Sequence, residues 1–233
     1  MGKKLIIQGA DFSQNGMTPP HTDIEWIGVS TSPTQYISSG VSLKNTSKLI
    51  IDFTTKAASS NFPTSSDRGC FIGAILNNSK SLAFAVNASA SGSSVNQALR
   101  AVYGRTNSES AYKYVKDILD GQRHTFEISP SGYVIDGVSA AWPDNTWANT
   151  GDGSLPIYLD SYSAASTPSQ SNLPTYSDLV KVHRVRIYDD ATTLVFDARP
   201  VMKADGTICY YDGVSGNYFS RNDGSTPANS TQL

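Results

Sequence analysis

Short apolar runs separated by turn-forming residues recur along the whole chain, and this rhythm restricts the possible folds more than any other feature of the sequence. The runs are rich in Val, Ile, Tyr and Phe, which suit a pleated, half-buried surface, and they end at Gly, Asn, Asp, Ser or Pro, which favour turns. Three of the clearest runs predict strands at 48–55, 123–129 and 180–188. Further strands are expected at 24–29, 69–76, 81–86, 99–103, 133–135, 155–162, 193–200, 207–211 and 216–219.

Residues 111–119 are compatible both with a helical stripe and with strand alternation, and we interpret them as a strand. Asp120-Gly121 is then expected to form the hairpin turn into 123–129, because Asp-Gly suits a two-residue hairpin. Ser131-Gly132 is expected to form the next turn, into 133–135.

The acidic residues are divided unevenly, with Glu25, Glu109 and Glu127 the only Glu among 20 Asp and Glu. Glu favours helices and Asp favours turns, so the composition disfavours helix. The 233 residues predict one all-β domain, a two-sheet antiparallel sandwich over 24–219. An N-terminal extension is expected at 1–23, with a short strand at 5–7 that pairs with a sheet edge or a neighbouring subunit, and a polar tail at 220–233.

Charge and hydropathy restrict the partners. Charged residues make up 16% of the chain and the net charge is -2, so the sequence carries no electrostatic footprint for nucleic acid or an anionic membrane. No stretch is long enough to span a bilayer, and Leu5-Ile6-Ile7 is too short for a signal-peptide core. Cys70 and Cys209 lie in apolar runs and are expected to be buried thiols, with a long-range disulfide as the alternative.

Three stretches carry a family resemblance: SPTQYISSGV (32–41), GQRHTFEISPSGYVIDG (121–137) and VHRVRIYDDATTLVFDARPVMKADGTICYYDGVSGNYF (182–219). They resemble the LamG-like, concanavalin A-like domains of gut-bacterial surface and prophage proteins. The resemblance implies a jelly-roll sandwich whose C-terminal hairpins close its edge. It also implies glycan or protein binding, and it favours an extracellular, cell-surface or virion location.

Catalytic motifs are not visible. The glycosidases of this family place Glu-x-Asp-x-x-Glu on one strand, and neither Glu25 nor Glu127 is part of such a motif. No Gly-x-Ser-x-Gly elbow is present, and His21, His124 and His183 lie far apart in the sequence. The sequence therefore predicts a protein that is not an enzyme, with a glycosidase built on paired Asp residues as a distant alternative.

The loop 140–153 holds two indoles among polar side chains and is the best candidate binding site. Exposed rings beside Asp and Asn suit sugars, which present both C–H faces and hydroxyl groups. The alternative is that one or both indoles fold back over the end of a sheet. The proposed ligand-binding residues are Trp142, Asp144, Asn145, Trp147 and Tyr162, with Tyr103 a weaker candidate.

Two further expectations concern other residues. Asp144, Asp152 and Asp160 are weak candidates for a calcium site, with ordinary use of Asp in turns as the alternative. Trp26 is expected to be a core or sheet-face residue.

Together these features predict a non-catalytic carbohydrate-binding or adhesion domain of a surface or virion-associated protein. The expected partner is a glycan or a surface protein. A structural or oligomerisation module in a phage-tail or surface assembly explains the same sequence, and the oligomeric state stays open.

Overall fold

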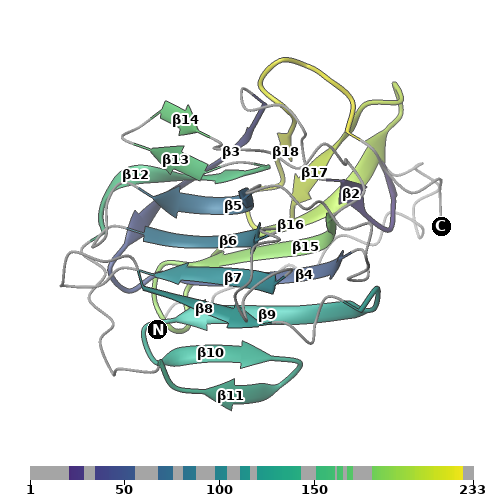
Figure 1. The fold of residues 1–233 in the computed structure, drawn as a ribbon. Helices are drawn as coiled ribbons and strands as arrows, with labels where there is room; N and C mark the ends of the chain where they lie inside the picture. The colour runs from purple at the N-terminus through teal and green to yellow at the C-terminus, as the bar shows by residue number, and fades with distance from the viewer. Residues whose placement is uncertain are drawn as a thin grey trace, which may run out of the picture.

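The computed structural model describes residues 21–28, 35–55, 68–75, 81–87, 98–103, 111–115, 120–142, 151–160, 162–164, 167–169 and 180–227. Within these ranges the chain forms strands and no helix, and the strands make two sheets that face each other as a sandwich (Figure 1). The all-β, two-sheet prediction is confirmed. No helix in the described ranges has the length and apolar character needed to cross a membrane.

The larger sheet has ten strands. Its central path runs β11 (Val138–Ala140), β10 (Gly132–Ile135), β9 (Arg123–Ser129), β4 (Lys48–Thr55), β15 (Val180–Tyr188), β16 (Leu194–Lys203), β17 (Ile208–Asp212) and β18 (Tyr218–Phe219). All neighbours on this path are antiparallel. Two short strands join it from the side, β1 (His21–Asp23) on β16 and β2 (Ile27–Gly28) on β15.

The smaller sheet has eight strands. Its central path runs β14 (Thr167–Ser169), β13 (Tyr162–Ala164), β5 (Arg68–Ile75), β6 (Ser81–Asn87), β7 (Ala98–Tyr103) and β8 (Ala111–Val115), and β12 (Asp152–Leu159) pairs with β5 and with β3 (Ile37–Lys44). The pairing is antiparallel except for one parallel contact between β13 and β5.

The core fills the space between the sheets, because alternate residues of each strand point inward. In β4, Leu49, Ile51 and Phe53 are fully buried, as the period-two pattern requires. Phe84 on the smaller sheet meets Phe126 on the larger one with ring centroids 5.1 Å apart. These contacts join the two sheets into one hydrophobic core.

Gly73 in β5 sets how closely two strands of the smaller sheet approach. Its φ is 150°, and a Cβ there would lie 2.3 Å from the Cβ of Ala83 and 2.5 Å from the carbonyl oxygen of Leu82. Neither atom belongs to a flexible side chain, so only glycine fits this position.

A bulge in β15 changes which face its residues occupy. The register against β4 shifts between Val182 and Arg184, so His183 is an extra residue. Val182 and Val185 both face the core, and Arg184 and Arg186 face outward. The alternation of inward and outward side chains along this strand is therefore interrupted at His183.

Two local predictions fail for reasons of topology. Within the expected strand 24–29 the described residues form only β2, and a bend at 24–26 separates it from β1, because β1 pairs with β16 and β2 pairs with β15. Asp120-Gly121 does not close a hairpin, because β8 belongs to the smaller sheet and β9 to the larger one. The Ser131-Gly132 turn is confirmed, with Gly132 paired to Ser129.

Both ends of the described chain pack onto the sandwich, beyond the expected limits of 24–219. β1 pairs with β16, and in the C-terminal segment the Asn222 N–H donates to the Tyr36 carbonyl at 2.9 Å. The Arg221 side chain is buried. The strand expected at 5–7 lies outside the described residues.

Candidate functional site

Trp142 lies in the core, which corrects its assignment as a sugar-stacking residue. Its indole is 3% exposed and stacks on Tyr103 with a centroid distance of 3.9 Å. The indole N–H donates to the Ser129 carbonyl at 2.9 Å. Trp142 therefore follows the alternative of an indole folded over a sheet end, and Tyr103, itself 2% exposed, is removed from the surface with it.

Of the other proposed ligand residues, the structure describes only the backbone of Tyr162. Asp144, Asn145 and Trp147 lie outside the described residues. Tyr162 begins β13, where its backbone pairs with Ser169. The binding role of these four residues stays a prediction.

The calcium proposal fails for its two described members. Asp152 is exposed at the start of β12 and accepts hydrogen bonds from the N–H and hydroxyl of Ser154. Asp160 is buried beyond the other end of that strand, where it accepts a hydrogen bond from Arg221. An eight-residue strand is about 26 Å long, so the two carboxylates cannot share an ion. Asp144 lies outside the described residues, and no metal-ligating cluster occurs in the described ranges.

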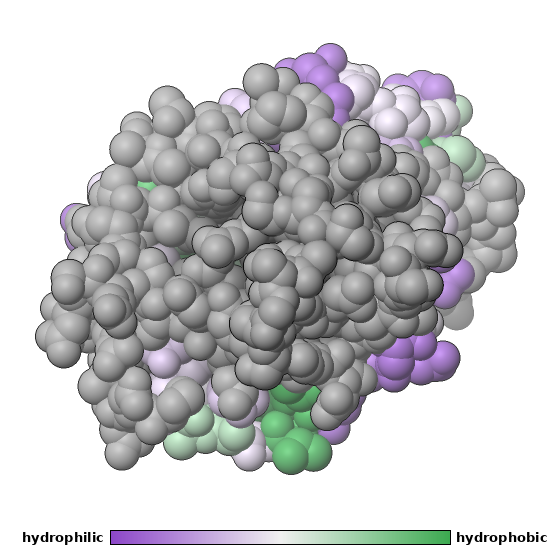
Figure 2. Space-filling model, in the orientation of Figure 1, coloured by the Kyte–Doolittle hydropathy of each residue, from purple (hydrophilic) through white to green (hydrophobic). Residues whose placement is uncertain are grey.

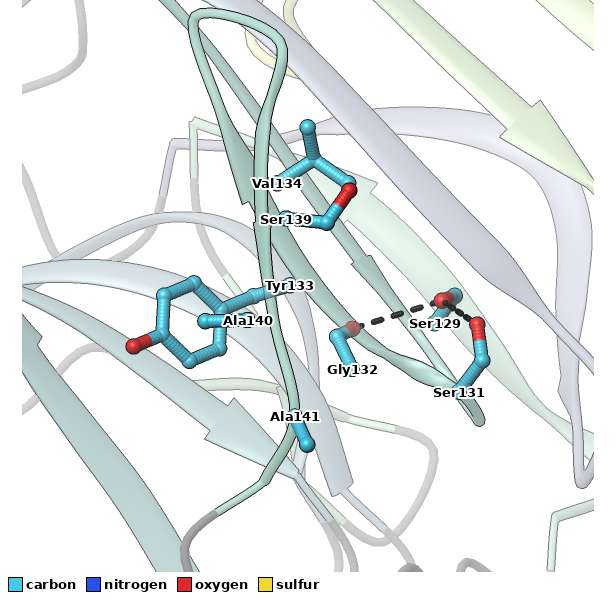
Figure 3. A pocket seen from close by; sticks show the side chains of 8 residues that line it. All are labelled: Ser129, Ser131, Gly132, Tyr133, Val134, Ser139, Ala140 and Ala141. Carbon is cyan, nitrogen blue, oxygen red and sulfur yellow. Dashed lines mark hydrogen bonds between the residues drawn. The ribbon is translucent and has the colours of Figure 1, made fainter.

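A hollow of about 190 Å³ opens beside Trp142, where the β9–β10 turn meets the β10–β11 hairpin (Figure 3). Two features of the sequence build it. Gly132 has a φ of 144° and leaves room for the Ala140 carbonyl, and Asp136 adopts a left-handed φ of 47° in the hairpin turn. The lining residues are Ser129, Ser131, Gly132, Tyr133, Val134, Ser139, Ala140 and Ala141.

The lining of this hollow is neutral and rich in hydroxyl groups. The Ser129 hydroxyl is 3.0 Å from that of Ser131 and donates to the Gly132 carbonyl at 3.3 Å. Tyr133 is also one of the lining residues, and its ring packs on Trp142 at a centroid distance of 5.5 Å. None of the lining residues is Asp, Glu, His or Lys. This surface can hold a neutral polar group.

An exposed apolar area lies next to the hollow. Val138 in the edge strand β11 is 73% exposed. Figure 2 shows an apolar area at the lower edge of the molecule, where Figure 1 places β10 and β11.

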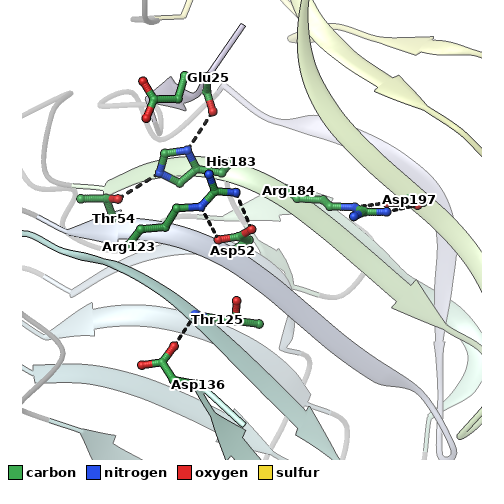
Figure 4. A network of polar contacts seen from close by, with 9 residues as sticks. All are labelled: Glu25, Asp52, Thr54, Arg123, Thr125, Asp136, His183, Arg184 and Asp197. Carbon is green, nitrogen blue, oxygen red and sulfur yellow. Dashed lines mark hydrogen bonds and ion pairs between the residues drawn. The ribbon is translucent and has the colours of Figure 1, made fainter. Parts of the chain in front are cut away.

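The outer face of the larger sheet carries an ordered set of charges (Figure 4). Arg123 holds Asp52 with two hydrogen bonds of 2.8 and 2.6 Å, and Arg184 holds Asp197 with two of 2.7 and 2.6 Å. The pKa of each guanidinium is raised, first by the hydrogen bond to its carboxylate. Each arginine forms a bidentate ion pair with one aspartate. The positive charges are therefore matched, and the face is polar without being strongly basic.

His124 is held between two carboxylates at one end of β9. Its Nδ1 is 2.7 Å from Asp136 and its Nε2 is 3.0 Å from Asp120. Burial alone would lower the pKa of His124, but hydrogen bonds and attraction from Asp136 and Asp120 outweigh it and raise the pKa above the ordinary value. The pKa of Asp120 is lowered, first by its hydrogen bond to His124. This cluster was not predicted from the sequence, because Asp136 reaches His124 only through the pairing of β9 with β10.

The fold and these sites define a class, a two-sheet all-β domain with a small neutral hollow at one sheet end. Comparison with known proteins adds no family. No family model matches the chain, and no curated protein matches it.

Distant similarity exists to solved structures of phage tailspikes. One is full-length tailspike protein 2 from Escherichia coli O157:H7 bacteriophage CAB120, with 12% identity and a TM-score of 0.41 over 78% of this chain. Another is the enzymatically active domain of tailspike protein 2 from bacteriophage CBA120, with the same identity, TM-score and coverage of this chain. The chain spans 27% and 31% of their lengths.

Proposed function

We propose that this domain is a non-catalytic carbohydrate-binding or adhesion module of a surface or virion-associated protein. The hollow between β9, β10 and β11 carries the proposal, because its lining combines serine hydroxyl groups with apolar and aromatic residues and contains no charged residue. Sugars need hydrogen-bonding partners for their hydroxyls and an apolar surface for their C–H faces. The hollow offers both.

The size of the hollow sets what it holds. A volume of about 190 Å³ is below the roughly 300–1,000 Å³ of pockets that enclose a drug-sized ligand. The hollow therefore accommodates one terminal or branch sugar of a larger glycan. Few contacts give weak binding, with dissociation constants in the micromolar to millimolar range, about -8 to -4 kcal/mol.

We also propose that the two sheets form a jelly roll of the concanavalin A-like, laminin-G-like type. The C-terminal sequence supports this, because β16, β17 and β18 are consecutive antiparallel strands that complete the larger sheet. A fold of this class does not determine where a ligand binds, so the binding site is inferred from the hollow alone.

A matched pair of substitutions tests the hollow on the full chain. A broad glycan array first identifies a ligand, and titration calorimetry then compares S139W with S38W. Ser139 lines the hollow, whereas Ser38 is exposed on β3 in the other sheet. We expect Ser139→Trp to fill the hollow and weaken binding at least about tenfold, or about 1.4 kcal/mol, with the melting temperature unchanged. Ser38→Trp should bind as the wild type does.

Trp147→Ala adds a separate arm for the residue predicted from the sequence. If Trp147→Ala and Ser139→Trp each lose affinity, Trp147 and Ser139 belong to one binding site. Loss in Trp147→Ala alone would place the site away from the hollow. A wild-type chain that binds nothing on the array would refute the carbohydrate proposal.

The second candidate function is a structural interaction module, and Val138 favours it. A large apolar side chain exposed on a short edge strand is a contact surface for another chain. Replacing Val138 by Lys would then reduce self-association in sedimentation experiments without changing glycan binding. An unchanged sedimentation profile would exclude this surface.

A further inference from the structure

The larger sheet divides at one point, and an N-terminal segment fills the division. β15 and β16 pair with each other from Val185–Ala198 to Tyr188–Leu194 and then diverge. We call the space between their diverging parts, residues 180–184 and 199–203, the fork. Residues 21–28 lie in it, with β1 along β16 and β2 along β15.

The segment bends at the closed end of the fork. The Ile24 N–H donates to the Pro200 carbonyl at 3.2 Å, and the Glu25 carbonyl accepts a hydrogen bond of 2.8 Å from Nδ1 of His183, the bulged residue of β15. Ile24 and Ile27 are 4% and 0% exposed and enter the common core. The bulge and the bend therefore fit each other.

Residues 21–28 are held mainly by contacts with residues far away in the sequence. His21 contacts Tyr218, 197 residues away, and the Gly28 carbonyl accepts from Arg221, 193 residues away. The Asp23 carboxylate pairs with Arg199 at 3.1 Å, and Lys181 lies 4.7 Å from the centre of the Trp26 ring. These contacts all reach residues 181–221, so in the described part of the chain the segment is held by strands remote from it in sequence.

We propose that the fork is a strand-acceptor site that residues 21–28 of a second copy of this chain can occupy, so that exchanged segments link copies into an assembly. Residues 21–28 can be exchanged without losing any of the contacts described above, because the partner presents the same fork. An empty fork would expose unpaired edges on β15 and β16 together with the core positions of Ile24 and Ile27. A copy that has released its own segment therefore accepts a segment of the same sequence best.

Two histidines make the exchange sensitive to pH. His21 lies against Tyr211 and Tyr218, with Asp23, Arg199 and Lys203 as the charged groups around it. Burial lowers the pKa of His21 and outweighs the attraction of Asp23.

His183 behaves in the same way. Nδ1 donates to the Glu25 carbonyl, so in the neutral ring Nε2 accepts from the Thr54 hydroxyl at 2.9 Å. Asp52, Arg123 and the Glu25 carboxylate are the charged groups near it, and burial is the largest cause of its lowered pKa. Both rings take up a proton more readily once the segment leaves, so acid favours release and exchange.

The experiment uses full-length chains. Wild-type protein is held at about pH 5, where both histidines favour the released state, returned to neutral pH and examined by sedimentation. We expect a dimer fraction that rises with protein concentration and with time at acid pH. In I27D, which places a carboxylate in the core position of β2, that fraction should disappear. A wild-type chain that stays monomeric at every concentration overturns the proposal.

Cross-linking then locates the contact. Thr22 and Met202 are opposite each other in the β1–β16 register, so chains carrying only T22C are mixed with chains carrying only M202C, taken through the acid step and oxidised. Peptide mass spectrometry should find a disulfide between positions 22 and 202 of different chains. T22C mixed with S38C, on the other sheet, is the control and should give no such link. A dimer without the 22–202 link refutes exchange through the fork, and glycan binding is unaffected by either result.

Discussion

At the scale of single residues, the protonation of His124 contributes to the stability of the fold. The two ring nitrogens of His124 each meet a carboxylate, from Asp136 and Asp120. The raised pKa of His124 means that the folded state binds its proton more tightly than the unfolded state does. The stabilisation is fully present below the ordinary histidine pKa and is lost as the pH rises through the raised value. The stabilisation is also lost at low pH, when the pH falls through the lowered pKa values of Asp120 and Asp136 and these carboxylates become protonated.

Replacing His124 by Gln should remove this dependence. We expect the difference in melting temperature between wild type and H124Q to be largest near pH 5 and to shrink toward pH 8, approximate limits set by histidine titration. The contributions of His21 and His183 are common to both proteins and cancel in the difference. Melting curves at several pH values measure it. A difference that grows with pH would contradict the assignment of the His124 charge.

Strands with a regular pattern were predictable from the sequence, and irregular ones were not. The bounds of β4, β9 and β15 agree with the predicted runs, because their apolar residues face one core through most of their length. The bulge at His183 and the fork depend on contacts between residues about 160 positions apart, which no local pattern encodes. Trp142 was ambiguous for the same reason, since its acceptor is a carbonyl at the end of β9.

The β10–β11 hairpin allows a prediction at the level of one element. In Gly132→Ala the new Cβ would lie 2.3 Å from the Ala140 carbonyl oxygen, so the hairpin must move. We expect a loss of about 1–3 kcal/mol in the free energy of unfolding together with loss of any binding in the hollow.

Gly137→Ala is the matched control for this hairpin. Gly137 has a φ of 83° and no atom within 4 Å of its Cβ position, so only backbone strain of about 1 kcal/mol applies. Urea denaturation compares the two variants. Equal losses would mean that the close contact at Gly132 has no energetic effect.

At the scale of the whole molecule, one buried ion pair connects its parts. Arg221, near the end of the described chain, donates to the Asp160 carboxylate at 2.9 Å and to the Gly28 carbonyl at 3.1 Å. Asp160 follows β12 of the smaller sheet, and Gly28 ends β2 on the larger one. Burial raises the pKa of Asp160, against the opposing attraction of Arg221. The contacts of Arg221 therefore connect the two sheets, and they join residues near both ends of the described chain.

Arg221→Met should therefore destabilise the whole domain. It leaves a buried carboxylate without its cation, at a cost of about 3–5 kcal/mol, and unfolding should stay a single transition. Arg123→Met is the control, because the Arg123 side chain is 53% exposed in its pair with Asp52 and ion pairs at the surface contribute about 0–1 kcal/mol. The double variant D160N/R221M should recover part of the stability. Similar losses for R221M and R123M in urea denaturation would refute the central role of this pair.

Gly73 also bears on how distant relatives of this chain can be recognised. Where the identity between two chains is very low, most positions carry no usable signal. The position of Gly73 is an exception, because β5 lies so close to β6 that a Cβ there would meet a backbone oxygen and the Cβ of Ala83. A chain that keeps this strand pair must keep a residue without a side chain at the first position and a small one at the second. A search restricted to such sterically fixed pairs can therefore detect descent that an average over the full alignment hides.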